Sequence, residues 1–220
     1  GTNVAIGLDC LQANTTASDN VGVGHSALEA NTTGASNTAV GKNSLGANII
    51  GSNNTALGKN ALQNTTTNWA TAIGFEALKT QSTGSRNVAV GYQSSVNLTT
   101  GVSNTSVGML SLAANTTGSY NIAVGELSLD ANTTGANNTA LGYQALSGNT
   151  TAAANTAVGT YALLANTTGA SNVAVGFQSL RTSTTALENT AVGYQTLYAT
   201  TTGAYNTAMG MQAGTALTTG

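Results

Sequence analysis

Few side chains in this sequence could perform acid–base or nucleophilic chemistry, and their spacing does not assemble a catalytic set. His25 is the only histidine, and Glu29 follows it four residues later. Nucleophilic catalysis needs a histidine placed between a nucleophile and an orienting acid, and no serine keeps a fixed relation to His25. Cys10 is the only cysteine and stands at a repeat position that otherwise holds small residues, so we expect a buried thiol. The sequence therefore predicts no enzyme and no cofactor.

Metal and phosphate sites are not indicated either. Calcium-binding β-rolls need an aspartate that recurs in every repeat, whereas the acids here fall at different repeat positions. Gly41-Lys42 and Gly58-Lys59 are each followed by Asn, which breaks the phosphate-loop pattern. The acids are Asp9, Asp19, Glu29, Glu76, Glu126, Asp130 and Glu188.

Composition excludes two further classes of function. Only 5% of the 220 residues are charged, the net charge is −2, and the five cations are scattered along the chain. A nucleic-acid-binding protein needs a basic stripe to displace counterions, so we expect no nucleic-acid partner. No apolar run approaches the ~20 residues of a membrane-spanning helix, so we expect no membrane insertion.

The main feature is an internal repeat built on Asn-Thr-Ala-Val-Gly. Its glycine occurs 13 times, from Gly7 to Gly210, and the step between successive glycines is seventeen residues throughout, except from Gly58 to Gly74, where it is sixteen. The consensus is NTAVGYQALxANTTGAS. One residue is missing near Asn64, as expected of a turn, where deletions are tolerated.

Comparing the 13 copies position by position shows which residues are restricted. The residue before the glycine is always large and apolar, and the residue before that is small. A leucine stands four residues after the glycine in all copies except those with Ser95 and Gly214. The position after the leucine varies freely, which predicts that it faces solvent. It holds, among others, Glu29, Lys79, Asp130 and Arg181.

These columns predict an all-β fold, a parallel β-solenoid (β-roll) of 13 coils with seventeen residues per coil, as a single domain over residues 1–220. Seventeen residues are too few for a helix pair, whereas Thr-Ala-Val-Gly fits a short strand closed by a turn. Asn-Thr-Thr-Gly fits a turn in which Asn and Gly adopt positive φ. The stack would be roughly 60 Å long at ~4.8 Å per coil. Identical residues would form ladders, with Gly91 and Gly108 on adjacent coils. The structural ladder residues are Asn37, Asn104, Asn121, Asn155, Gly91, Gly108 and Gly125.

An alternative makes Gly-Tyr-Gln-Ala-Leu a turn of helix, with Ala and Leu on one side. In either case we expect the large apolar residues of both columns to be buried. The residues expected to be buried are Val90, Val107, Val124, Val158, Leu112, Leu129 and Leu146. Neighbours on a strand point to opposite faces, yet both faces carry restricted residues, so we expect identical chains to pack side by side. No capping segment is visible, so we also expect coils that continue in a longer fibre protein or ends that stack on other chains.

The repeat resembles known families. Asn-Thr-Ala-Val-Gly with Ala-Leu and Asn-Thr-Thr-Gly, as at Asn155 to Gly159 and Asn189 to Gly193, resembles repeats of phage tail-fibre and bacterial surface proteins that often precede a self-cleaving chaperone domain. It is also similar to the shorter Ser-Val-Ala-Ile-Gly repeats in head domains of trimeric autotransporter adhesins. The resemblance covers all 13 repeats. It implies a β-roll, three chains side by side and a role in attachment at a cell or virion surface.

The expected function is that of a structural or adhesive extracellular fibre segment whose partners are identical chains, with a homotrimer favoured over a helical filament. A filament that binds no receptor is one alternative. Ice binding by ranks of threonine, such as Thr32-Thr33 and Thr133-Thr134, is another. Aromatic residues recur after the glycine and could contact a cell-surface glycan receptor or a neighbouring chain. They include Tyr92, Tyr143, Phe177 and Tyr194.

Overall fold

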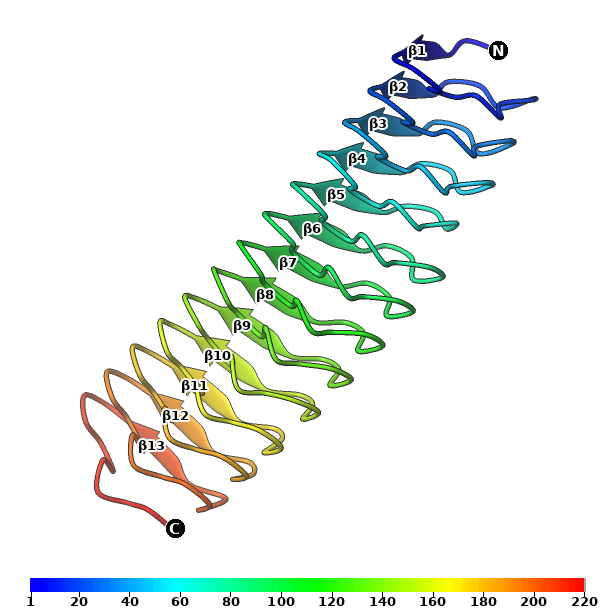
Figure 1. Cartoon of the computed structure of the whole chain (residues 1–220). Coiled ribbons are helices and arrows are strands. Elements are labelled where there is room, and N and C mark those ends of the chain that lie inside the picture. Colours follow the sequence, from blue (N-terminus) through cyan, green and yellow to red (C-terminus); the bar gives the residue numbers. More distant parts are fainter. Residues whose placement is uncertain (220) are drawn as a thin grey trace.

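The computed structural model describes residues 1–219 and shows an all-β, parallel solenoid of about 12 turns with about 17 residues per turn (Figure 1). Thirteen three-residue strands form one sheet in sequence order, each paired only with its neighbours along the chain. No helix occurs in these residues, which excludes the helical alternative. The strands are β1 (Val4–Ile6), β2 (Val21–Val23), β3 (Thr38–Val40), β4 (Thr55–Leu57), β5 (Thr71–Ile73), β6 (Val88–Val90), β7 (Thr105–Val107), β8 (Ile122–Val124), β9 (Thr139–Leu141), β10 (Thr156–Val158), β11 (Val173–Val175), β12 (Thr190–Val192) and β13 (Thr207–Met209).

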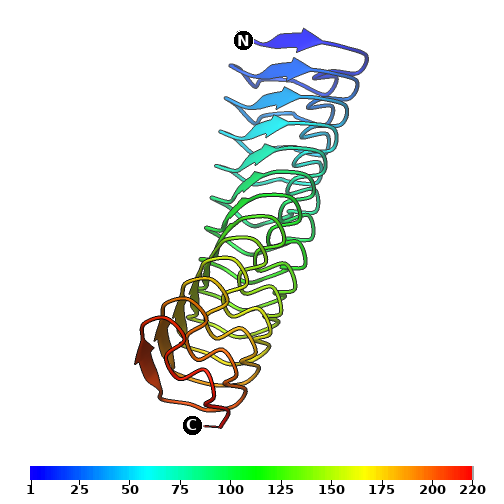
Figure 2. The same cartoon turned by 90° about the vertical axis from the view of Figure 1, so that its left-hand side faces the viewer.

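The strands stack in an unslipped register, and the two ends of the chain lie at opposite ends of a rod (Figures 1 and 2). In β10 and β11, for example, Thr156, Ala157 and Val158 pair with the corresponding residues one repeat later. Figure 2 shows that the sheet turns gradually about the rod axis, as expected from the right-handed twist of strands.

The glycine after each strand lies directly against the glycine of the next coil. A Cβ atom on Gly91 would lie 2.5 Å from the backbone oxygen of Gly108, which confirms that these glycines occupy adjacent coils. Gly91 also has a φ of 134°, a conformation that side-chain-bearing residues rarely adopt. Two independent constraints therefore require glycine at this position.

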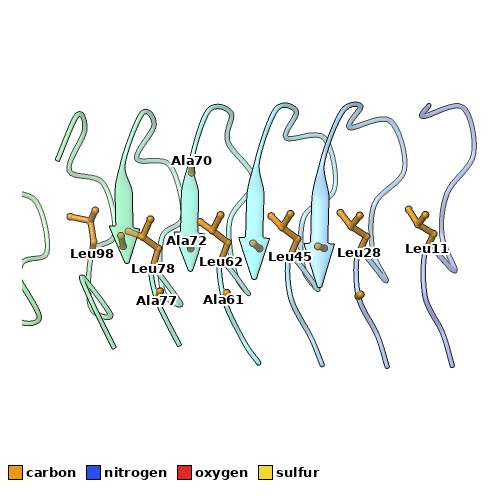
Figure 3. Close-up of a cluster of buried hydrophobic side chains, with 14 residues drawn as sticks. Leu11, Leu28, Leu45, Ala61, Leu62, Ala70, Ala72, Ala77, Leu78 and Leu98 are labelled. Atoms are coloured by element: carbon orange, nitrogen blue, oxygen red, sulfur yellow. The ribbon is translucent and has the colours of Figure 1, made fainter. Parts of the chain in front are cut away.

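The leucine column forms the core, as predicted. Leu112, Leu129 and Leu146 are completely buried, and the leucines of successive coils point into the interior in a single row (Figure 3). Each leucine from Leu28 onward is preceded by a small buried residue, such as Ser128 before Leu129. Two consecutive residues can both face inward because Leu129 has a left-handed φ of 52°, which interrupts the alternation of a strand.

The prediction that the valine column is buried was wrong. Val124 is 37% exposed, and Val90, Val107 and Val158 are only half-buried. The small middle residue of each strand points inward instead, and Ala123 is completely buried. The interior is narrow at this point, because the strand faces the leucine row of the same thin coil, and it accommodates only a methyl group. The valines therefore lie on the outer surface of the sheet.

Two other local predictions were also wrong. The Asn and Gly of the Asn-Thr-Thr-Gly turn do not have positive φ in the coil from Asn121 to Asn137; Leu127, Leu129 and Asn137 have it instead. The position after the leucine is not fully exposed, because its side chains lie along neighbouring coils. Glu29, Lys79, Asp130 and Arg181 are half-buried.

The 16-residue coil is shortened in its turn, between Thr65 and Thr67. The amide of Asn54 reaches the backbone oxygen of Thr67, 13 residues on, whereas this bond spans 14 residues in other coils. The following coil begins with Ala70 in place of Asn, and Thr67 Oγ1 makes the missing donation to the backbone oxygen of Gly84, at 2.6 Å. The buried amide of Gln81 bonds both threonine hydroxyls, so local hydrogen bonds absorb the deletion.

A second irregular coil exchanges an apolar and a polar residue. Ser95 replaces the leucine of the core column, and Leu98, three residues later, replaces a buried asparagine. The Ser95 hydroxyl lies 2.8 Å from that of Ser106, which bonds Ser94 in turn. These buried hydroxyls divide the apolar core into two clusters, one ending at Leu98 and the other beginning at Leu112.

Candidate assembly surface

The outer surface of the sheet runs along all 13 strands of the rod, and we call it the sheet face. It consists of two columns, formed by the first and the third residue of each of the 13 strands. The first column contains only Thr, Val and Ile, and the third contains only Val, Ile, Leu and Met. None of these residues is charged. The exposed large residues of the third column include Leu57, Ile73 and Leu141.

Such a surface is unusual for an isolated chain. A protein surface normally carries interspersed charges, and a contiguous exposed apolar patch of more than a few hundred Å² marks an interaction site. The sheet face is about 60 Å long at ~4.8 Å per strand. Its inward residues are already buried, so the absence of charge on its outward side and the apolar third column have no explanation within one chain.

The predicted aromatic residues lie beside the sheet face and stack on one another. The rings of Phe75 and Tyr92 are parallel at 5.4 Å between centroids, and those of Phe177 and Tyr194 at 5.5 Å. Tyr161 bridges Tyr143 and Phe177 with edge-to-face contacts, which extends the second row over four coils.

This stacking affects what the aromatic rows can bind. Sugar rings stack on aromatic faces, but rings 5.4–5.5 Å apart leave no room for a ligand between them. The outer face of Phe75 is partly covered by Lys59 Nζ, 5.7 Å from its centroid. The rows therefore present ring edges and hydroxyls outward, which suits contact with protein better than stacking on a sugar.

The predicted asparagine ladder lies inside the coil. Asn37 Oδ1 accepts a hydrogen bond from the backbone N–H of Asn54 on the next coil, at 2.9 Å, and Asn37 Nδ2 donates to the backbone oxygen of Gly51. Asn104, Asn121 and Asn155 make the equivalent bonds. Gly108 and Gly125 continue the file of strand-ending glycines. All seven ladder residues thus have a structural environment and none reaches a ligand surface.

A second asparagine ladder was missed by the sequence analysis. Asn132 is buried, and its Nδ2 donates to Asn115 Oδ1 of the preceding coil and to the backbone oxygen of Gly135. Asn149 continues the ladder by donating to Asn132 Oδ1 at 2.9 Å. The sequence carries a signal for this ladder, because an asparagine stands three residues after the core leucine in most repeats, although Asn-Thr-Thr-Gly is also typical of a turn.

The turn threonines considered for ice binding lie next to this ladder. The hydroxyl of Thr32 donates to the backbone oxygen of Ile49, and that of Thr133 to Thr150, each on the next coil. The second threonine of the pair, such as Thr33 or Thr134, is exposed. Half of the hydroxyls in these ranks are therefore already engaged within the chain.

The chemically reactive residues are not brought together. His25 Nε2 lies 3.8 Å from Asp9 Oδ2 on an exposed surface, with no nucleophile joined to them. Cys10 is half-buried, and burial raises the pKa of its thiol. Gly22 stands where the other strands have alanine or, in β7, serine, and a Cβ atom there would lie 2.5 Å from Cys10 Sγ. Burial also raises the pKa of Asp130, partly offset by a hydrogen bond from Ser147.

Within residues 1–219 there is no pocket, no cluster of three or more potential metal ligands, and no helix of the length and apolarity needed to cross a membrane. Comparison with known proteins gives no relative: no protein-family model, curated protein or solved structure matches the chain. The sheet face and its flanking aromatic rows are therefore the candidate functional surface.

Proposed function

We propose that this chain is a structural segment of an extracellular fibre, of the phage tail-fibre or bacterial surface adhesin type, that functions by packing side by side with identical chains. The observation that supports this most directly is the uncharged, apolar sheet face, which repeats on every strand. A threefold bundle is the first choice of arrangement, on the basis of the adhesin resemblance, and a helical filament is the second. The proposed setting is a cell or virion surface, where attachment to a receptor would be a further role.

A repeating face favours a second copy as the partner. Each contact recurs at ~4.8 Å intervals along the rod, so weak individual contacts add up over 13 strands. A partner whose surface does not repeat at this axial spacing would lose the match after a few coils.

The test is sedimentation velocity at micromolar concentration on the native chain and on Val124→Asp/Val158→Asp. We expect an oligomer for the native chain and a monomer for the variant, with little change in the melting temperature, because both valines point outward. Thr134→Asp, on the exposed turn, is the matched control and should leave the oligomer intact. A native chain that is monomeric at these concentrations would contradict the proposal.

Ice binding is a second candidate, favoured by one observation. The first column of the sheet face holds threonine on eight strands, and no hydrogen bond within residues 1–219 engages those hydroxyls: Thr38, Thr55, Thr71, Thr105, Thr139, Thr156, Thr190 and Thr207. A flat array of methyl and hydroxyl groups could order water. Thermal hysteresis that is present in the native chain and lost in Thr139→Lys/Thr156→Lys would favour this function over lateral packing.

A further inference from the structure

Two more exposed columns border the sheet face. The leading column consists of the residue two positions before each strand, such as Asp19 before β2, and runs in single-coil steps to Tyr205. The trailing column consists of the residue two positions after each strand, such as His25 after β2, and runs to Met211. Asp19, His25, Tyr205 and Met211 are all exposed. The full outward surface therefore has four columns, with the sheet face in the middle.

On four of the 13 strands the leading and trailing residues have complementary chemistry. β2 is flanked by an acid and a histidine, β5 by two aromatic rings, β6 by a cation and an aromatic ring, and β13 by an aromatic ring and a thioether. Each of these combinations is attractive at short range, and no strand is flanked by two like charges. The pairs are Asp19 and His25, Trp69 and Phe75, Arg86 and Tyr92, and Tyr205 and Met211.

These pairs cannot form within one chain. The two residues are six positions apart along a segment that contains the three-residue strand and bends at the glycine after it, so they lie up to about 20 Å from each other, on opposite borders of the sheet face. Trp69, for example, is 57% exposed, and its complement Phe75 stacks on Tyr92 of the next coil instead. Such complementarity is expected if the leading column of one copy contacts the trailing column of a neighbouring copy.

We propose that identical chains pack side by side in the same direction, with the leading column of one chain against the trailing column of its neighbour at the same strand. This arrangement rests on the proposed function and adds how the copies are oriented and aligned. In a closed ring of chains, corresponding strands must lie at the same height along the rod axis. A constant axial offset between neighbours would generate an open helix instead of a ring.

A neighbour that runs in the opposite direction fits less well. If the neighbour is related by a two-fold axis perpendicular to the rod, its leading column faces the leading column of the first chain, and β2 lies opposite β12. Asp19 would then face Glu188, two like charges that are both exposed. The parallel arrangement places Asp19 near His25 and leaves Glu188 beside Tyr194, whose hydroxyl can donate to it.

The area of this surface can be compared with that of a standard interface. Four columns span about 20 Å across the rod and 13 strands span about 60 Å along it, which gives about 1,200 Å². In a closed ring each chain shares this surface between two neighbours, so about 600 Å² faces each of them. A specific interface of standard size takes about 800 Å² from each partner, which is of the same order.

Disulfide cross-linking tests the alignment. In a Cys10→Ala background, Ala154→Cys and Thr160→Cys introduce the leading and trailing residues of β10. We expect the double variant to form covalent oligomers on oxidation, while either single variant stays a single chain on a non-reducing gel. The two cysteines cannot join within one chain, because a disulfide needs Cα atoms within about 7 Å. Asn53→Cys/Lys59→Cys, around β4, is the second pair if the first impairs folding.

An offset pair checks the register. Thr160→Cys/Ser171→Cys places the cysteines on successive coils and should cross-link several-fold less than the matched pair. Sedimentation of the reduced protein separates the two hypotheses. Oligomers that give no cross-links in either matched pair, or that cross-link better in the offset pair, would overturn the proposed alignment but leave lateral packing in place. A monomer would overturn both.

Discussion

At the scale of single residues, the rod depends on backbone conformations that most side chains avoid. The glycine after each strand has a φ near 130° and touches the backbone of the next coil, as for Gly108 against Gly125. Three further positions of the coil from Asn121 to Asn137, at Leu127, Leu129 and Asn137, are left-handed without being glycine. Repetition of these conformations turns the chain through one coil in each repeat.

Gly108→Ala should strongly destabilise the protein. Alanine is strained at a φ of 132°, and its Cβ would lie 2.6 Å from the carbonyl group of Gly125. Together these effects should cost about 2–5 kcal/mol in the free energy of unfolding, measurable by chemical denaturation.

Gly135→Ala is the matched control for this change. Gly135 also approaches the next coil, and a Cβ atom there would lie 2.2 Å from the backbone oxygen of Ala152, but its φ is not left-handed, and Ala152 itself carries a methyl group at the same place one repeat later. We expect a smaller loss than for Gly108→Ala, about 1–2 kcal/mol, because only the steric contact and not the backbone conformation is unfavourable. Equal losses for the two substitutions would contradict the distinction between the two glycine columns.

Glu76 should make stability depend on pH. Hydrogen bonds from Lys79 Nζ at 2.7 Å and Gln93 Nε2 at 2.8 Å, with a weaker one from Asn60, lower the pKa of its carboxyl group. Because the folded pKa lies below the unfolded one, the stabilisation is fully present above the unfolded pKa and is lost as the pH falls through the folded pKa.

Glu76→Gln should therefore lower the melting temperature at pH 7 by an amount corresponding to about 1 kcal/mol or less. The difference from the native protein should shrink as the pH falls below the ordinary pKa of a glutamate carboxyl group, and it should disappear once the pH is below the lowered pKa of folded Glu76. Glu188→Gln, an exposed glutamate with no ion pair in residues 1–219, serves as the control. If the difference in melting temperature between the native protein and Glu76→Gln stays constant from neutral to acidic pH, Glu76 is not the source of the pH dependence.

At the scale of one coil, the sequence predicts the topology well but not the direction of the side chains. Period, register and the buried leucine column could all be derived, because each follows from a residue type that recurs once in every repeat. Which side of each strand faces the interior could not be derived from the sequence. Alternation places Ala123 and Val124 on opposite faces, but the width of the interior decides which face is inside, and that width depends on the left-handed leucine and two asparagine ladders.

The paired exchange at Ser95 and Leu98 should behave as one unit. Ser95→Leu alone would overpack the interior beside Leu98, at a cost of about 1–3 kcal/mol. Leu98→Asn alone would leave a cavity and cost about 2–4 kcal/mol. The double variant recreates the leucine and asparagine of the regular coils, so its stability should be close to that of the native protein. Chemical denaturation of all four proteins gives the coupling energy, and additive losses would show that the two positions are independent.

At the scale of the whole molecule, every coil contacts only the coil before it and the coil after it. The sheet pairs each strand with its immediate neighbours alone, and the side-chain ladders also step by one repeat. Stability in such a protein is approximately a sum over coils and their interfaces. In the proposed alignment the sheet face would have the same local character, because each strand would meet only the strand at the same height on a partner.

Deletion of residues 138–154 should therefore leave a folded rod. The cut joins Asn137 to Asn155, which restores the sequence context that Asn138 had, and removes one complete coil. We expect a cooperative melt, a circular dichroism spectrum of unchanged shape and retained association. Deletion of residues 138–150 removes a similar mass but is four residues short of a full coil, and it should abolish the cooperative melt. Comparable behaviour of the two deletions would contradict the nearest-neighbour account.

The stacking of interchangeable coils has a consequence for how such a gene could change. Unequal recombination between its near-identical repeats would add or remove whole coils, and each product would be a rod that differs by ~4.8 Å in reach. The length of the rod could thus vary between lineages, because added coils would form the same contacts as the existing ones. The 16-residue coil, held by Thr67 and Gln81, shows that even an event out of phase can be retained when nearby polar side chains replace the lost hydrogen bond.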